Sequence, residues 1–172
     1  MKKTLIAIAF LIIAVFSFAQ NTLGTRMKIL EVEEYNNNNY SVFTYKDYYG
    51  SRDYYLSLGH IYNYMQTSRE FMNELVSEIC LYLGVTTDEA IDSVGYLLGM
   101  FGSEPGTTTM FRCRVATDSD KLSDYKNIKC MVVKRRIQGK CLSFQYETDK
   151  GTVETFMTKS SLKMIKKGLK IR

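Results

Sequence analysis

Apolar and polar residues alternate in four short segments of the second half of the chain, and this alternation constrains the fold more than any other feature. In segment 111–116, for example, Arg112 and Arg114 separate three apolar residues. Successive residues of a strand point to opposite faces of a sheet, so the alternation predicts strands that bury one face. The segments 138–139 and 149–151, which end in Gly139 and Gly151, suit tight turns, which would make successive strands antiparallel.

The region 27–58 contains further strand-like segments. Strands are predicted at 27–35 and 40–46, and a third short strand at 54–58. The asparagines at 36–39 form a predicted hairpin loop, because asparagine tolerates left-handed backbone geometry.

Apolar residues with helical spacing follow these strands. They recur every three, four or seven positions, at Ile61, Met65, Met72, Leu75, Ile79 and Leu83. A second helix is predicted between the capping box at 86–89 and Gly102. Since the link between the two helices is only a few residues, we expect an antiparallel helical hairpin. A last helix is predicted from about Ser160.

These segments together predict an α+β fold with antiparallel sheet or sheets in the order βββ-αα-ββββ-α. The helical hairpin and the C-terminal helix would pack on the sheet. Residues 20–172 would form a single domain. Six residues on the apolar sides of their elements are expected to be mostly buried against one another: Ile79, Leu98, Phe111, Val133, Phe144 and Leu162.

Residues 1–19 have the layout of a secretory signal peptide. Two lysines precede an uncharged, mostly apolar run of 14 residues at 5–18, which is shorter than the roughly 20 residues of a spanning helix. Ser17 and Ala19 are the small residues that a signal peptidase recognises, so the mature chain would begin at Gln20. We therefore expect a secreted or periplasmic bacterial protein without a transmembrane segment; a retained membrane anchor is the alternative.

The charge of the mature chain limits its partners. Loss of Lys2 and Lys3 with the signal peptide lowers the formal net charge from +5 to +3. A balance this close to neutral is not typical of nucleic-acid binders, so nucleic acid is an unlikely partner. A protein or glycan of the cell envelope is the expected kind of partner.

The four cysteines are compatible with disulfides in a secreted chain, but their spacing fits neither a redox nor a zinc motif. With a two-residue turn at 138–139, Cys130 and Cys141 would lie roughly 20 Å apart along one face, too far to bond. We expect at most one bridge, with Cys113–Cys130 the favoured pair and no bridge as the alternative. Cys80 is expected to be a buried free thiol on the first helix.

Few residues suggest catalysis, and no cofactor motif is present. His60 is the only histidine, which excludes metal sites with two or three histidines, and it is expected at a helix start. A pair of carboxylates across a cleft would support a small hydrolase, and this remains an alternative. The clustered acids are instead expected on the solvated faces of helices; they are Glu74, Glu78, Asp88, Glu89 and Asp92.

Two charged clusters have simple structural explanations. The acidic loop at 118–124 lacks the EF-hand register, since Leu122 occupies a ligand position, and a polar turn is favoured over a weak calcium site. The basic residues at 134–136 could bind an anionic partner, but a solvated strand end is the simpler interpretation.

The tyrosine-rich stretch at 45–55 is the best candidate for a recognition surface. Tyrosine offers a rigid contact area and a hydroxyl group, although these side chains could merely cover a sheet edge. The candidate binding residues are Tyr45, Tyr48, Tyr49, Arg52, Tyr54 and Tyr55. The sequence therefore favours a non-catalytic binding or interaction module; a small hydrolase and a structural component of the cell envelope are the alternatives.

Overall fold

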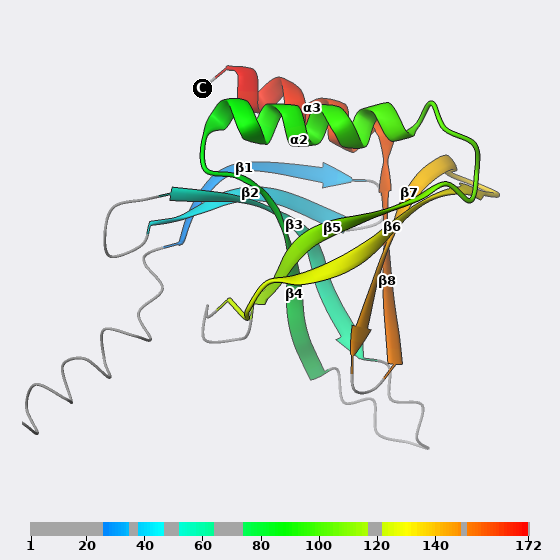
Figure 1. Ribbon diagram of the computed structural model, residues 1–172, viewed down its shortest axis with the longest axis horizontal. Coiled ribbons are helices and arrows are strands. Elements are labelled where there is room, and N and C mark those ends of the chain that lie inside the picture. The colour runs from blue at the N-terminus through cyan, green and yellow to red at the C-terminus, as the bar shows by residue number, and fades with distance from the viewer. Residues whose placement is uncertain are drawn as a thin grey trace, which may run out of the picture.

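The computed structural model describes residues 26–34, 38–46, 52–63, 74–116, 122–148 and 151–171, and this part forms one eight-stranded antiparallel sheet and two helices (Figure 1). The strands lie in the sheet in chain order: β1 (Arg26–Glu34), β2 (Asn38–Lys46), β3 (Arg52–Asn63), β4 (Glu74–Gly84), β5 (Thr108–Ala116), β6 (Lys126–Arg135), β7 (Gly139–Thr148) and β8 (Gly151–Thr158). Helix α2 (Thr87–Met100) joins β4 to β5, and α3 (Lys159–Lys170) follows β8.

The sheet curls so strongly that β8 contacts β2 and β3. The Thr155 hydroxyl donates to the Leu58 carbonyl at 3.2 Å, and the Tyr40 hydroxyl donates to the Phe156 carbonyl. The two helices lie side by side along the open side of the curl (Figure 1). The sheet therefore has an inner face, which encloses the core under the helices, and an outer face.

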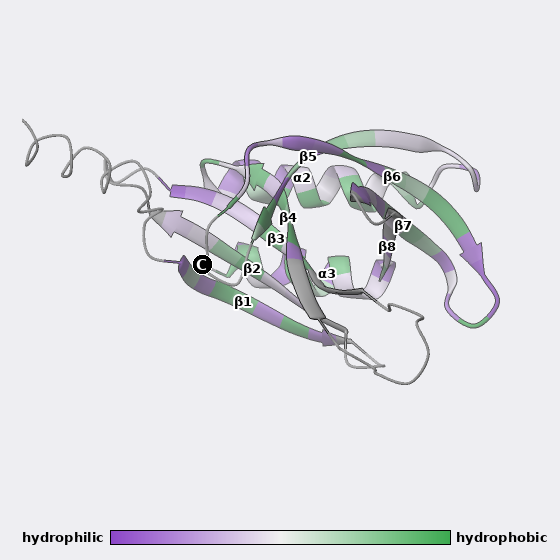
Figure 2. Cartoon of the chain, turned by 90° about the horizontal axis from the view of Figure 1, so that it is seen from below, coloured by the Kyte–Doolittle hydropathy of each residue, from purple (hydrophilic) through white to green (hydrophobic). Residues whose placement is uncertain are grey.

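The inner face carries the main core. Alternate residues of the strands and the apolar sides of both helices meet there, and the alternation is visible in the colours of Figure 2. Of the residues expected in the core, Ile79, Phe144 and Leu162 are fully buried, and Leu98 and Phe111 pack at its margin. Val133 was wrongly expected there.

Val133 lies half-buried on the outer face because β6 directs Cys130 and Val132 inward. The turn before β7 explains the wrong register. Arg135 pairs with Gly139, so the turn has three residues, 136–138, and Gly139 has a φ of +71°. A two-residue turn at 138–139 was expected instead.

The predicted order βββ-αα-ββββ-α, with its helical hairpin, is wrong, since the described residues have the order ββββ-α-ββββ-α. The segment 74–84 is a strand whose inner face presents Ile79 and Leu81 and whose outer face presents Cys80, all buried. A strand that buries both faces loses the alternation that identifies strands, and its apolar residues can match helical spacing by chance. Residues 64–73, which include Met65 and Met72, lie outside the described residues.

The predicted second helix is confirmed as α2, together with its capping box. The Thr86 hydroxyl accepts from the Glu89 backbone N–H at 3.2 Å, and the Glu89 carboxylate accepts from the Val85 N–H at 2.7 Å. The partner of α2 is α3 rather than a preceding helix. A Cβ atom at Gly95 would lie 2.8 Å from the Lys166 amine, so the Lys166 side chain of α3 lies directly over α2 at this glycine.

All four cysteines are buried, and none of them forms a disulfide. Cys113 pairs with Lys126 and Cys130 with Thr109, so the two thiols are not opposite each other and the favoured Cys113–Cys130 bridge is wrong. The alternative without a bridge matches the structure. Cys80 is a buried free thiol as expected, but on a strand. Residues 1–19 lie outside the described residues, and among those described no helix is long and apolar enough to cross a membrane.

Candidate binding surface on the outer face of the sheet

Two of the tyrosines proposed from the sequence meet on the outer face. Tyr45 and Tyr55 are 5% and 0% exposed, and both pack against Phe43 at centroid distances of 5.4 and 5.7 Å. Burial keeps Tyr55 from contacting a ligand directly, and it raises the pKa of this hydroxyl, as does the hydrogen bond with Tyr125. Both tyrosines therefore stabilise the outer face by packing and are not exposed on it.

The other candidates from this stretch lie elsewhere. Tyr54 points to the inner face, half-buried, with its hydroxyl 3.0 Å from the Thr87 hydroxyl. Arg52 is exposed at the start of β3. Tyr48 and Tyr49 lie outside the described residues, so the stretch does not form one continuous surface within the described part. Its role in binding stays a prediction.

The outer face carries a chain of aromatic rings that runs from β2 to the residue before β6. We call it the outer cluster and define it by Phe43, Tyr45, Tyr55, Tyr82 and Tyr125. The contacts run from Tyr55 to Tyr82 at 5.6 Å and from Tyr82 to Tyr125 at 5.5 Å, both edge to face. Such pairs stabilise the sheet beyond the area they bury. An arginine lies over a ring at each end of this cluster.

At the β1 end, Arg26 lies 3.9 Å over the ring of Phe43. Its guanidinium also makes a two-pronged pair with Glu78, at 2.6 and 2.8 Å. Burial alone would lower the pKa of Arg26, but the hydrogen bonds and charge of Glu78 outweigh it and leave the pKa raised. A register shift between Lys28 and Leu30 in β1 accompanies this arrangement. The charge at this end is thus compensated.

At the β5 end, two arginines lie over one ring. The guanidinium carbons of Arg112 and Arg114 are 4.0 and 4.7 Å from the centroid of Tyr125. Arg114 is anchored, since its side chain donates to the Ser123 carbonyl and, at 3.4 Å, to the Tyr55 hydroxyl. The Tyr55 hydroxyl is in turn 2.9 Å from the Tyr125 hydroxyl.

Arg112 differs from both Arg26 and Arg114. It is exposed, and its guanidinium also lies 5.3 Å from the ring of Tyr82. Within the described ranges, it has ring contacts but makes no hydrogen bond or ion pair. Its N–H groups are therefore available to an anionic group outside this part of the chain.

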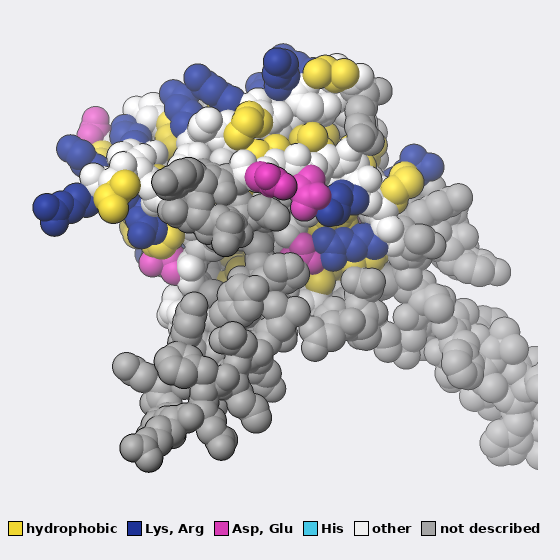
Figure 3. All heavy atoms as spheres, turned by 180° about the vertical axis from the view of Figure 1, so that it is seen from behind, with side chains coloured by type: hydrophobic (Ala, Val, Ile, Leu, Met, Phe, Trp, Pro, Cys, Tyr) yellow, Lys and Arg dark blue, Asp and Glu magenta, His cyan; other side chains and the backbone are white. Residues whose placement is uncertain are grey.

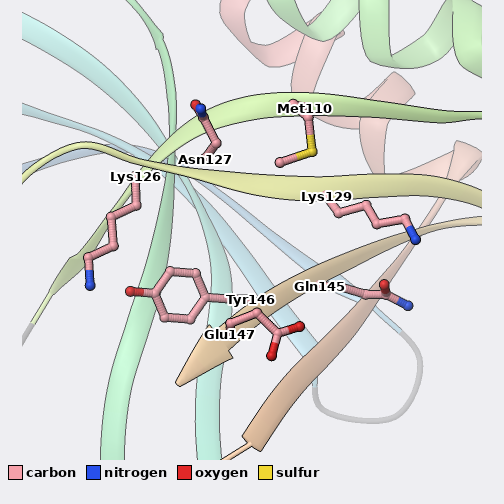
Figure 4. A pocket seen from close by; sticks show the side chains of 7 residues that line it. All are labelled: Met110, Lys126, Asn127, Lys129, Gln145, Tyr146 and Glu147. Carbon is pink, nitrogen blue, oxygen red and sulfur yellow. The ribbon is translucent and has the colours of Figure 1, made fainter. Parts of the chain in front are cut away.

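A shallow hollow of about 210 Å³ lies next to Arg112 on β5, β6 and β7 (Figure 4). It is lined by Met110, Lys126, Asn127, Lys129, Gln145, Tyr146 and Glu147. Asn127 pairs with Arg112 in the sheet, and Met110 precedes Arg112 by two residues on the same face. We define the β5–β6 surface as Met110, Arg112, Tyr125 and Lys129.

Basic charge predominates at this surface. Arg112 and Lys129 are exposed there, Lys126 lies over the Tyr146 ring at the edge of the hollow, and Glu147 is the one acid among the residues that line the hollow. The Glu147 carboxylate accepts a hydrogen bond from the Thr152 hydroxyl at 2.9 Å. In the view of the whole molecule from behind, the described basic side chains also cover more of the visible surface than the described acidic ones (Figure 3). An anionic partner would therefore be favoured.

The other residues singled out in the sequence give no catalytic arrangement within the described ranges. Glu78 was wrongly expected on a solvated helix face, since it is 7% exposed on β4 and pairs with Arg26. His60 lies within β3, not at a helix start. Asp88, Glu89 and Asp92 are exposed on α2 as expected. Among the described residues, no three His, Cys, Asp or Glu side chains gather into a metal site.

The two charged clusters lie away from the outer cluster or are only partly described. Residues 117–121, most of the acidic loop, are outside the described ranges. The basic residues 134–136 are exposed at the end of β6, as expected for a solvated strand end, and Arg135 lies 3.7 Å over the ring of Phe156.

Sequence reasoning missed the β5–β6 surface. The alternation at 111–116 placed Arg112 and Arg114 on one face, but nothing in the spacing showed that both guanidinium groups would lie over the ring of Tyr125. Comparison with protein-family models, with curated proteins and with solved structures finds no match.

Proposed function

We propose that this chain is a non-catalytic binding or interaction module and that the β5–β6 surface is its binding surface. One observation carries the proposal. Arg112 is exposed and lies over two tyrosine rings, yet it has no acidic partner among the described residues. A guanidinium supported in this way loses less conformational entropy when it binds an anionic group.

The composition of the surface supports the same function. Met110 is 60% exposed and Tyr125 is 37% exposed, next to Arg112. Methionine, tyrosine and arginine are enriched at protein interfaces relative to the rest of a protein surface. The hollow beside them adds a concave area into which a partner's side chain can fit.

The hydrolase alternative has less support. Glycoside hydrolysis requires two carboxylates on either side of the bond that is cleaved. The hollow on β5–β7 is lined by a single carboxylate, Glu147. Glu78 is held by Arg26 and is not free for acid–base chemistry. No observation favours a purely structural role in the envelope.

The proposed compartment is the periplasm or the exterior of a bacterial cell, with a protein or glycan of the envelope as partner. This part of the proposal rests on the signal-like residues 1–19. Mass analysis of the N-terminus of protein recovered from the envelope or medium tests it. A mature chain that begins at or near Gln20 supports export, and an intact Met1 on membrane-bound protein contradicts it.

Site-specific photo-crosslinking in the producing cell tests the binding surface. A photoreactive residue in place of Met110 is expected to give a discrete adduct of higher mass. Ile137, 96% exposed in the β6–β7 turn, is the matched control position and is expected to give none. Absence of an adduct at position 110, or equal adducts at both positions, would contradict the proposal.

A further inference from the structure

We propose that the partner of the β5–β6 surface is an extended acidic segment of another protein, which lies along β5 with a carboxylate at Arg112 and an apolar side chain at Met110. This inference rests on the proposed binding function and adds the chemistry of the partner. The spacing of side chains on β5, the charges beside Met110 and the contacts of the Tyr125 ring each support it.

The spacing on β5 matches that of an extended peptide. Met110 and Arg112 are two residues apart on the same face of one strand, roughly 7 Å. An extended peptide places every second side chain on one side with the same repeat. A segment in which acidic and apolar residues occupy alternate positions on that side would contact both at once.

The charges on either side of Met110 favour an acidic segment. Lys129 pairs directly with Met110 across β5 and β6, and Arg112 follows Met110 by two positions. Two exposed cations therefore flank one exposed apolar side chain. Carboxylates beside an apolar residue complement this order, and opposite charges both steer association and fix the register of the bound segment.

The Tyr125 ring favours a peptide over an anionic glycan. Sugars bind tyrosine largely through the open face of the ring. The guanidinium carbons of Arg112 and Arg114 already lie 4.0 and 4.7 Å from the Tyr125 ring, which also packs against Tyr82 in a T-shaped arrangement at 5.5 Å. The ring thus orients guanidinium groups, whose planar N–H groups fit carboxylates in pairs.

Binding of short synthetic peptides to the full mature chain tests this inference by fluorescence anisotropy. The first peptide alternates glutamate with leucine; the second has serine in place of leucine, and the third has lysine in place of glutamate. Dextran sulfate is the anionic glycan probe. We expect the glutamate–leucine peptide to bind more tightly than the other two, and its affinity to fall as salt rises.

Three variants locate the binding. Arg112→Gln is expected to weaken binding of the glutamate–leucine peptide by about tenfold or more. Met110→Ser is expected to remove the preference for leucine over serine. Lys163→Gln changes an exposed lysine on α3, a helix that packs against α2, β1 and β8, and is the matched control that should leave both properties unchanged.

Three outcomes would overturn the inference: no binding of the glutamate–leucine peptide, binding unchanged by Arg112→Gln, or equal binding of the serine peptide. Dextran sulfate binding that depends on Arg112, without such peptide binding, would assign the surface to an anionic glycan instead. If the peptide fails but the crosslink at position 110 remains, the binding function stands and only the acidic segment is wrong.

Discussion

Both ends of the outer cluster place an arginine over an aromatic ring in nearly the same way, yet they differ in whether an acidic side chain pairs with that arginine. Arg26 lies 3.9 Å over Phe43 and Arg112 lies 4.0 Å over Tyr125. Arg26 is paired with Glu78 from β4, whereas Arg112 is exposed and has no acidic partner among the described residues. The first end therefore stabilises the sheet, and the second leaves a positioned cation at the surface.

Removal of the carboxylate at the β1 end should have the largest effect on stability. Glu78→Ala removes the carboxylate that pairs with the half-buried Arg26 guanidinium over Phe43, and the variant should lose about 3 kcal/mol of unfolding free energy. Urea titration of the variant and the wild type measures this loss. A change below about 0.5 kcal/mol would show that the pair does not hold the β1 end in place.

Thiol labelling should separate the two ends by a second route. Burial raises the pKa of Cys80, and it raises the pKa values of Cys113 and Cys130 to about 12, so the native thiols should react slowly at pH 8. If labelling requires opening of the fold, a loss of about 3 kcal/mol in Glu78→Ala should accelerate it roughly hundredfold. Arg112→Gln should leave the rate unchanged. Fast labelling of the wild type would contradict the burial of the thiols.

Tyr55 lies between the two ends and should have an intermediate effect. Tyr55→Phe removes hydrogen bonds to Tyr125 and Arg114, so it should cost about 1 kcal/mol near pH 8. The folded-state pKa of Tyr55 is raised above its ordinary value of 10.0, so the neutral hydroxyl contributes stability below pH 10 that is lost as the pH rises further. Urea titrations at several pH values should show the difference between wild type and variant shrinking above pH 10. A difference that grows there would contradict the assigned sign.

The sequence was sufficient to predict the strands that bury one face. Alternation located β5 to β8, and the capping box at 86–89 located α2. Alternation did not identify β4, because this strand is apolar on both faces and the spacing of its apolar residues also matches that of a helix. The predicted register of β6 against β7 was also wrong. The residues Gln138 and Gly139 do not determine how many residues the turn contains, and the turn has three residues, 136–138.

The candidate surface was harder to predict from the sequence than the fold. The tyrosine-rich stretch predicted Tyr45 and Tyr55 as binding residues, but both side chains are buried in the outer cluster. Arg112 is positioned by the rings of Tyr82, which lies on the neighbouring strand β4, and of Tyr125, which directly precedes β6. Such a juxtaposition depends on strand register, and no pattern within one segment shows it.

The most direct measurement compares the unfolding free energies of Arg26→Gln and Arg112→Gln, which make the same chemical change at the two ends. We predict a loss of about 3 kcal/mol for Arg26→Gln, because it removes the guanidinium that pairs with the buried Glu78 carboxylate. For Arg112→Gln we predict a change within about 0.5 kcal/mol, as for other exposed positions. Equal losses in the two variants, or a larger loss for Arg112→Gln, would contradict the assignment of a structural role to one end and a binding role to the other.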